Sequence, residues 1–588
     1  MMKKTIRSAI SVFMTAALLI SMPITSAAYD DFDAITNHVN LAVPQTLNIA
    51  RPSGNVTTST AYYYITGSSN PNQPLYMNGH LIETRGKLGS FGVYVSLAYG
   101  GNSVKFTQGD KSQSVIITRS DAAATVTTTT VATQLFPSFD NAFYAGQTVE
   151  ISCVAPAGAT VYATVNGQSV ALSQVAVAQQ GVPARFKGNY VMPEASGTVS
   201  LGNIKYTMTY GGAVTEYTSA GKLYTVGSSG TLLVMSTQVS AATVNDNGSK
   251  YLATAKLGAI DRVVDSNGTK YKLSAGGWIS RENVTPIAGA YSVVNNIKSY
   301  SFEQQSGGEV YRLAGGTHPL ATCVQTSEKL SVTLQNTYNV PAMSAEQSKL
   351  FSSIKVTQQA DSTLIEFILK PSAVLWGYVV EYNDGITNIY CKYKPSLSGN
   401  ASRPLEGITV VLDSGHGSKD PGALGVTQLT GPTESEINRA TAIAVKKRLE
   451  SLGATAILPD ELDLNSRFNE RMQPAIDYKA DFFISLHCNS TVLNANGLLP
   501  NGVEIYYYET QSAPFANSLQ SKMVAYTGRN NRGVKGNAFR VTLNSLAPSV
   551  LMEMGFMPNP YDYDDLCSKE GIYRTANAVG DAVIAHLS

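Results

Sequence analysis

Three ionisable residues follow or end apolar segments in the last third of the sequence. His416 lies in VVLDSGHGSKDPGA, just after a β-favouring run, while His487 ends ADFFISLH and Glu553 lies at the end of SVLMEMGF. A buried ionisable group is costly unless it is paired, protonated or bound to a metal. One such residue could be an ordinary hydrogen-bonded histidine, but three at equivalent positions predict a shared functional site.

A fourth candidate lies at a predicted helix start. In PTESE, Thr433 and Glu436 have the spacing of a capping box, which leaves Glu434 at the first helical position. Its charge could simply favour the helix dipole, or its carboxylate could be a metal ligand. Two histidines and one glutamate that leave a fourth position open match a hydrolytic zinc site, so His416, Glu434 and His487 are the predicted Zn²⁺ ligands.

These residues need an α/β scaffold. From about residue 404, apolar strand-like runs alternate with helical patterns, which predicts a mostly parallel sheet covered by helices on both faces. The active site of such a fold lies beyond the carboxyl ends of its strands. Residues 407–417 are predicted to form a strand and loop, further strands are predicted at 454–459, 480–489, 502–509 and 549–556, and the predicted helices are 432–453, about 464–480, 513–528 and 572–587.

Four segments in this region resemble the sequential motifs of the zinc-dependent N-acetylmuramoyl-L-alanine amidases, the Amidase_3 family. They are VVLDSGHGSKDPGA, TESEINRA, DFFISLHCNS and VLMEMGFMPNP. The resemblance covers about residues 404–588. It implies His416, Glu434 and His487 as zinc ligands, Glu553 as the catalytic carboxylate, and cleavage of the amide between N-acetylmuramic acid and the L-alanine of the peptidoglycan stem peptide.

Several nearby residues keep two interpretations. Asp413 could orient the ring of His416 or cap the glycine-rich loop. Arg471 and Arg532 stand where the family commonly has arginine, but structural salt bridges explain them equally well, and neither is a predicted site residue. Cys488 is predicted to pack in the core, because neighbouring strand residues point to opposite faces. The segment 512–528 reads as a packing helix, which predicts an open site with no autoinhibitory helix.

The preceding sequence predicts a series of all-β modules of sandwich and small-barrel types. YMNGHLIE and TVNGQSVA each read as strand, Asn-Gly turn, strand. The first modules resemble bacterial immunoglobulin-like domains, and TKYKLSAGGWISRENV resembles an SH3-like module. The predicted boundaries are 1–28 for a signal peptide, 29–120 for an immunoglobulin-like domain, 121–227 for a second sandwich, 228–287 for an SH3-like domain, 288–403 for a further β domain, and 404–588 for the catalytic domain.

The composition and N-terminus indicate an exported protein. Charged residues make up only 14% of 588 residues and the net charge is +1, so no charge excess points to nucleic acid. Basic residues, the apolar run AISVFMTAALLI and small residues before Tyr29 predict a cleaved signal peptide. No later segment resembles a membrane span, which predicts a secreted or cell-wall protein. The five cysteines show no CxxC pair, and their pairing is left open.

Two classes of function are compatible with these features, and the ligand chemistry alone also leaves open a zinc peptidase that acts on protein. The first is a zinc amidase held near its peptidoglycan substrate by β modules that bind the same polymer. The alternative is a non-catalytic wall-binding or surface-assembly protein with an inactive amidase-like domain. Loss of a predicted ligand or of Glu553 would favour the alternative, and the sequence retains all four residues.

Overall fold

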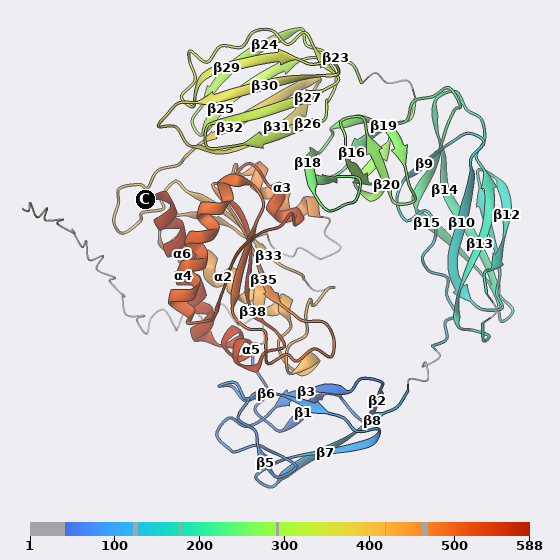
Figure 1. Cartoon of the computed structure of the whole chain (residues 1–588), viewed down its shortest axis with the longest axis vertical. Helices are drawn as coiled ribbons and strands as arrows, with labels where there is room; N and C mark the ends of the chain where they lie inside the picture. Colours follow the sequence, from blue (N-terminus) through green and yellow to red (C-terminus); the bar gives the residue numbers. More distant parts are fainter. Residues whose placement is uncertain (1–40, 122–126, 177, 290–292, 418, 460–467) are drawn as a thin grey trace, which may run out of the picture.

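The computed structural model describes residues 41–121, 127–176, 178–289, 293–417, 419–459 and 468–588 (Figure 1). It is a multidomain chain in which a strand-rich N-terminal region precedes a C-terminal α/β domain, as the sequence predicts. The predicted signal peptide lies outside the described residues. Within the described residues, no helix combines the length and apolarity needed to cross a bilayer.

The first β unit contains two sheets, with strand orders β1-β3-β6 and β2-β8-β7-β4-β5. Its core contains Ile65, Phe91, Phe106 and Ile117, all fully buried. The predicted hairpin forms between β4 and β5, with Asn78 and Gly79 at positive φ. The strands are β1 Asn48–Arg51, β2 Val56–Thr58, β3 Tyr62–Ser68, β4 Tyr76–Met77, β5 His80–Leu81, β6 Ser90–Ser96, β7 Gly100–Gln108 and β8 Lys111–Arg119.

The second β unit is a continuous ladder in the order β10-β13-β12-β11-β14-β15-β9. The second predicted hairpin joins β11 to β12 through Asn166 and Gly167, both at positive φ. The strands are β9 Asn141–Tyr144, β10 Thr148–Pro156, β11 Thr160–Val165, β12 Gln168–Gln174, β13 Pro183–Val191, β14 Thr198–Tyr210 and β15 Ala213–Val226.

The third β unit has the strand order β18-β17-β21-β20-β19-β16-β22, and the strand of the Gly-Trp-Ile motif, β21, pairs with β17 and β20. Its elements are β16 Leu233–Ser236, β17 Ser240–Val244, β18 Tyr251–Lys256, β19 Ile260–Ser266, β20 Lys270–Leu273, β21 Trp278–Ser280, the 3-10 turn η1 Arg281–Asn283 and β22 Val284–Pro286. The immunoglobulin-like and SH3-like assignments of these units remain predictions.

The fourth β unit has two four-stranded sheets, β24-β25-β32-β31 and β26-β27-β30-β29, and the short pair β23-β28. Its strands are β23 Asn295–Asn296, β24 Ser299–Gln305, β25 Gly308–Ala314, β26 Ala321–Gln325, β27 Lys329–Gln335, β28 Thr337–Tyr338, β29 Phe351–Gln358, β30 Ser362–Leu369, β31 Leu375–Asn383 and β32 Ile386–Tyr393.

The α/β domain is built on a six-stranded sheet in the order β34-β33-β35-β38-β36-β37. All pairings are parallel except β36 with β38. The strands are β33 Thr409–Ser414, β34 Thr455–Ile457, β35 Phe482–Asn489, β36 Val503–Tyr507, β37 Asn531–Gly536 and β38 Ser549–Phe556. The helices are α2 Glu434–Ser451, α3 Phe468–Asp477, α4 Ala513–Thr527, α5 Pro560–Cys567 and α6 Lys569–Leu587, with 3-10 turns η2 Gln428–Thr430, η3 Thr510–Ser512 and η4 Arg540–Leu543.

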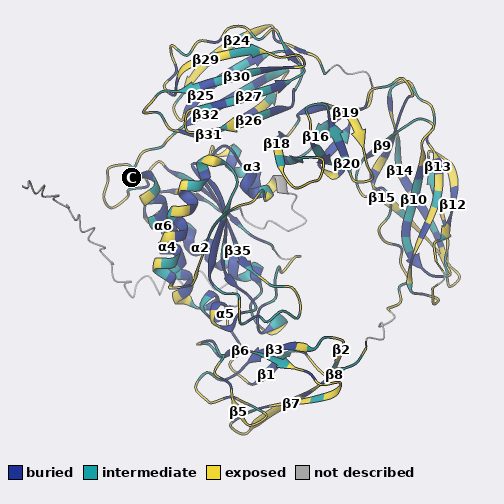
Figure 2. Ribbon diagram, in the orientation of Figure 1, coloured by how far each residue is buried: buried dark blue, intermediate teal, exposed yellow. Residues whose placement is uncertain are grey.

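Alternating strand residues divide the core of this domain between the two faces of the sheet. The larger cluster packs one face against α2, α4 and α6, while Val411, Phe483 and Leu551 on the other face meet Ala475 of α3 and Val541 of η4 (Figure 2). Helix α4 buries Phe515 and Leu519 completely, so it is a packing helix, as predicted. Full cover of both faces by helices remains a prediction, since residues 460–467 beside α3 are not described.

The β region touches the α/β domain at both of its ends. The first β unit lies against α5, and the fourth lies at the opposite end of the sheet (Figure 1). In the fourth unit, Trp376 Nε1 donates to the carbonyl of Asp481 over 2.8 Å, and Lys392 forms a buried ion pair with the Asp481 carboxylate at 2.9 Å. Through these contacts, the first and fourth β units pack directly against the α/β domain.

Candidate metal centre and active site

The sheet brings His487 and Glu553 side by side near the carboxyl ends of β35 and β38. The two residues are register partners on neighbouring parallel strands. The loop after β33 adds His416, whose ring centroid lies 5.0 Å from that of His487. The predicted site therefore lies where parallel strands end, as the topology rule for α/β folds requires.

Glu434 reaches the two histidines from the first residue of α2. Thr433 and Glu436 form the predicted capping box, which leaves the Glu434 side chain free to point into the site. Its Oε1 lies 3.2 Å from His416 Nε2 and 3.1 Å from His487 Nδ1. The backbone amides of Ala423 and Cys488 donate to the same carboxylate and fix its orientation.

The glycine-rich loop allows this close approach. A Cβ at Gly415 would lie 2.4 Å from the His487 ring, and one at Gly422 would lie 2.6 Å from Glu434 Oε2. Gly422 also has φ +68°, and His416 itself has φ +63° in the left-handed region. The glycines after β33 thus have a packing role at the site, beyond forming a turn.

The structure separates the two interpretations of Asp413. Its carboxylate accepts from Arg471 Nη1 at 2.6 Å and from Ser485 Oγ at 2.6 Å, rather than bonding to the His416 ring. Arg471 also donates to the carbonyls of Ser414 and His416, so this buried ion pair holds the loop backbone. The ring of His416 is oriented by Asp420, whose Oδ2 lies 3.0 Å from Nδ1.

The charges of the cluster are strongly coupled. Burial alone would raise the pKa of Glu434, but hydrogen bonds and attraction from both histidines outweigh it and hold that pKa well below its usual range. Burial lowers the pKa of His416, but the carboxylates of Glu434 and Asp420 outweigh it and raise the pKa to about 9. A carboxylate that stays ionised beside two imidazoles supplies negative charge for a cation at this position.

The donor set fits a zinc ion. One ligand atom from each of His416, Glu434 and His487 lies within 4.8 Å of the other two. Two imidazole nitrogens and one carboxylate oxygen form a set found in catalytic zinc sites, where a fourth position stays open. The side chains of His416 and His487 are 25% and 20% exposed, so that open side faces solvent. Asp420 on the far nitrogen of His416 is the usual outer partner of a metal-bound histidine.

Glu553 occupies a less polar environment than the other carboxylates. Its Oε2 is buried and has no hydrogen-bond partner among the residues that the structure describes. Burial, supported by repulsion from Glu434 and Glu504 and opposed by His487, raises its pKa to about 7. A carboxyl group with this pKa can both accept and release a proton near neutral pH.

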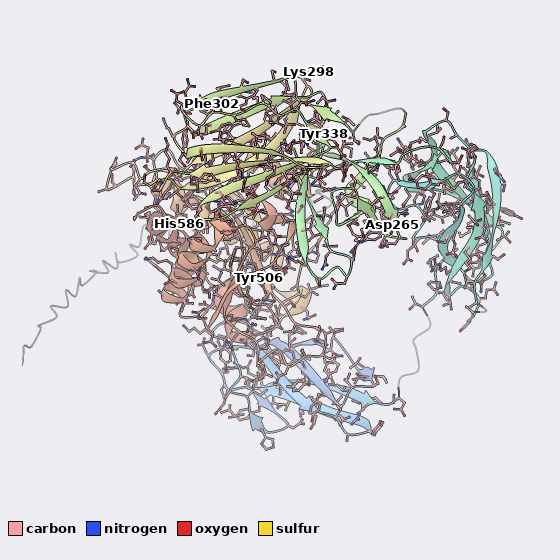
Figure 3. All side chains as sticks on the ribbon, turned by 45° about the horizontal axis from the view of Figure 1, so that its top comes forward. Asp265, Lys298, Phe302, Tyr338, Tyr506 and His586 are labelled. Atoms are coloured by element: carbon pink, nitrogen blue, oxygen red, sulfur yellow. The ribbon has the colours of Figure 1, made fainter. Side chains whose placement is uncertain are left out.

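A network that the sequence analysis missed surrounds Glu504, the register partner of Glu553 on β36. The Glu504 carboxylate accepts from Asn489 Nδ2 and Tyr506 OH, each at 2.7 Å, and pairs with Arg532 and Lys535. Burial raises its pKa, but these donors outweigh it and lower the pKa to about 2. Arg532 is thus a salt-bridge residue. The sequence signal that could have revealed this network is GVEIYYYE, which places the charged Glu504 within an apolar strand. Tyr506 is labelled in Figure 3.

The cysteines are packing residues. Cys488 is 3% exposed and belongs to the larger core cluster, as predicted from its position next to His487. Burial raises the pKa of its thiol well above the usual value. All five cysteines of the chain are free thiols.

Comparison with known proteins agrees with this geometry. The family model described as N-acetylmuramoyl-L-alanine amidase (Amidase_3) matches residues 410–585. The chain is 36% identical over 187 residues to the protein YqiI of Bacillus subtilis, a match that covers 31% of this chain and 86% of YqiI. It is 34% identical over 196 residues to the N-acetylmuramoyl-L-alanine amidase LytC of the same organism, covering 32% of this chain and 38% of LytC.

Among solved structures, the catalytic domain of the amidase CwlV from Bacillus (Paenibacillus) polymyxa var. colistinus is 30% identical, with a TM-score of 0.28. That match covers 31% of this chain and 98% of the CwlV domain. Through its C-terminal domain the chain belongs to the N-acetylmuramoyl-L-alanine amidase family, a class of amide hydrolases. The chain spans well under half the length of LytC.

Proposed function

We propose that the protein is an exported cell-wall hydrolase that cleaves the amide between N-acetylmuramic acid and the L-alanine of peptidoglycan. The observation that carries this proposal is the convergence of His416, Glu434 and His487 beside Glu553 at the carboxyl edge of the sheet. Membership of the amidase family and the likeness to LytC support the substrate class.

In this proposal His416, Glu434 and His487 hold Zn²⁺. A zinc ion held there would supply Lewis-acid polarisation of the scissile carbonyl and would lower the pKa of water at the site. Asp420 fixes the ring of His416, and the amides of Ala423 and Cys488 fix the Glu434 carboxylate, so these two ligands are held before the substrate arrives.

Glu553 is the proposed general base and acid. It accepts a proton from the attacking water and donates it to the departing alanine nitrogen, which balances the hydrolysis. Its pKa of about 7 suits both steps, whereas Glu504 stays ionised and paired with its cations. The environments of these two neighbouring glutamates therefore assign proton transfer to Glu553.

The remaining domain assignments belong to the same proposal. A signal peptide (1–28) directs export, and an immunoglobulin-like domain (29–120), a second sandwich (121–227), an SH3-like domain (228–287) and a further β domain (288–403) precede the catalytic domain (404–588). The proposed location is the cell wall or the medium, and the β modules are proposed to bind peptidoglycan. Relatives named as cell-wall amidases support this location.

The test uses purified full-length protein and peptidoglycan, with the metal removed by a chelator and zinc then added back. Mass spectrometry of the products is expected to detect stem peptides with a free L-alanine amino group, released only when zinc is present. Zinc-loaded protein that binds peptidoglycan but releases no such peptide would instead support the non-catalytic wall-binding alternative.

A further inference from the structure

The first β unit is fixed to the rim of the active site. Tyr64 OH donates to the carbonyl of Pro558 at 2.8 Å, and a Cβ at Gly497 would lie 2.4 Å from the Tyr64 ring. Pro558 comes five residues after Glu553, which places its Cα within about 18 Å of the Glu553 Cα. Gly497 lies in the segment that follows His487.

A second contact joins the same unit to α5. The Asp564 carboxylate, on a residue only 2% exposed, accepts from the backbone amides of Leu88 and Ser90 at 2.6 and 3.3 Å. A Cβ at Gly86 would lie 2.2 Å from Asp564 Oδ2, so the backbone of the β unit is in direct contact with the helix. Such burial of a carboxylate against amides needs a defined interface rather than a passing contact.

The contacts extend to the other loops around the site. Arg51 Nη2 donates to Asn494 Oδ1 at 2.5 Å, and β1 packs against η2 in the segment between His416 and Glu434. The first β unit therefore touches the chain segments next to all four proposed functional residues. Since the histidine side chains remain 20–25% exposed, it borders the site without closing it.

The docking face of this unit continues beyond the interface as a stacked aromatic pair, in which Tyr62 is exposed and Tyr94 is half-buried. Tyr64 and Tyr94 are cross-strand partners, and Tyr62 precedes Tyr64 by two residues, so all three side chains lie on one face of the sheet. The rings of Tyr62 and Tyr94 stack with centroids 5.3 Å apart and planes 9° apart. Tyr62 is 51% exposed, and neither hydroxyl has a hydrogen-bond partner among the described residues.

The chemistry of this pair suits a sugar ring. A flat, exposed aromatic face packs against the C–H face of a pyranose and removes apolar surface from water, while free hydroxyls at its edge can bind sugar hydroxyls. The cross-strand partner of Tyr62 is the neutral, exposed Ser96. A nucleic acid would instead require several cations beside the aromatic pair to neutralise its phosphates, whereas Arg51, which lies over the neighbouring Tyr63 ring, is hydrogen-bonded to Asn494.

From this placement we infer that the first β unit forms one wall of the substrate groove and that Tyr62 and Tyr94 are a platform for a sugar ring of the glycan strand. The inference rests on the proposed function, because it takes peptidoglycan as the substrate. It extends that proposal by assigning the glycan to two residues of a domain outside the amidase fold. The platform makes the length of the glycan strand a determinant of specificity.

The test compares full-length wild type with the double variant Tyr62→Ala/Tyr94→Ala. Two substrates are used: long peptidoglycan strands, and a muropeptide with a single N-acetylmuramic acid. On strands, the double variant is expected to show about tenfold higher KM and an unchanged kcat. The rise in KM corresponds to the loss of roughly one aromatic stacking interaction. Neither parameter should change on the small muropeptide. The ring-preserving variant Tyr62→Phe/Tyr94→Phe should retain most of the wild-type KM.

Tyr162→Ala is the matched control, because Tyr162 is 47% exposed on β11 of the second β unit. An unchanged KM on strands in the double alanine variant, or an equal rise with Tyr162→Ala, would overturn the platform. Sedimentation of the proteins with peptide-free glycan strands tests glycan binding separately from catalysis. If wild type hydrolyses nothing, the proposed function fails, while weaker sedimentation of the double variant alone would still support the platform.

Discussion

At the scale of single residues, two neighbouring glutamates have pKa values that are shifted in opposite directions. Glu553 and Glu504 are register partners on adjacent strands. Arg532, Lys535 and two neutral donors keep Glu504 ionised, whereas burial raises the pKa of Glu553 to about 7. When the environments of two neighbouring carboxyl groups shift their pKa values apart in this way, the group with the raised pKa is the one that carries the proton.

The pH dependence of hydrolysis follows from this environment. Glu553 must be unprotonated to accept the water's proton, so kcat/KM is expected to fall about tenfold per pH unit below its pKa. The burial and the neighbouring carboxylates place that acid limb near pH 7, and a bound cation moves it lower. Initial rates between pH 4 and pH 9 at fixed zinc measure it; a rate that rises steadily as the pH falls would contradict this role.

Asp420 is the residue that the sequence analysis overlooked as the partner of His416. Asp420→Asn is expected to weaken zinc binding by roughly 10–100-fold, since outer-sphere carboxylates orient ligand histidines. Competition with a chromophoric chelator gives the affinity. Asp265→Asn is the control, because Asp265 is exposed on β19, far from the α/β domain (Figure 3). Equal zinc affinity in Asp420→Asn and wild type would exclude the orienting role.

At the scale of elements, the apolar runs of the sequence predicted the strands that carry the site. SVLMEMGF is β38 itself, ADFFISLH ends within β35, and the capping box begins α2 at Glu434. These features are local, so hydrophobic periodicity and capping chemistry suffice to find them.

Elements without a local signal were missed. Helix α5 is short, and β37 contains two glycines, so neither has a distinctive period. The antiparallel placement of β36 beside β38, which brings Glu504 to Glu553, depends on pairing between segments about fifty residues apart. The contact of the first β unit with α5 likewise has no sequence signal, because non-local packing decides it.

Also at the scale of elements, a buried ion pair holds the backbone of the glycine-rich loop. Arg471 and Asp413 are 4% and 2% exposed, and removal of the arginine leaves a buried charge unpaired. Arg471→Ala is therefore expected to lower the unfolding free energy of the α/β domain by about 3–5 kcal/mol. Denaturant unfolding followed by Trp376 fluorescence in a Trp278→Phe background measures this, since Trp376 contacts Asp481 and Phe482.

The control for that variant is an exposed pair in another unit. Arg185 and Glu150 are 62% and 38% exposed, so Arg185→Ala should change stability by less than about 1 kcal/mol. A loss in Arg471→Ala no greater than that of the control would show that the buried pair does not hold the loop.

At the scale of the whole molecule, an aromatic cluster joins the fourth β unit to α6. The His586 ring lies 5.1 Å from Trp376 of β31 and 5.5 Å from Phe515 of α4, and Figure 3 labels it at this junction. Burial, with a smaller effect of Lys394, lowers its pKa to about 4. The unfolded chain then binds a proton between pH 6.5 and pH 4 that the folded chain does not.

Stability is therefore expected to fall as the pH drops through that window, because the unfolded state takes up the extra proton. His586→Phe removes the titrating group and keeps an aromatic ring, so its unfolding midpoint should depend less on pH between 6.5 and 4 than that of wild type. Thermal unfolding of both proteins at matched ionic strength gives the difference. Identical pH profiles would contradict a buried neutral His586.

The most direct test of the account measures zinc content and amide hydrolysis together in full-length wild type, Glu553→Gln and His487→Ala. Glu553→Gln should keep its zinc and lose roughly 10²–10⁴-fold in kcat, because only proton transfer is removed. His487→Ala should lose both zinc and activity, since it removes a ligand. Near wild-type turnover by Glu553→Gln, or full zinc and full activity in His487→Ala, would contradict the assignment of this site.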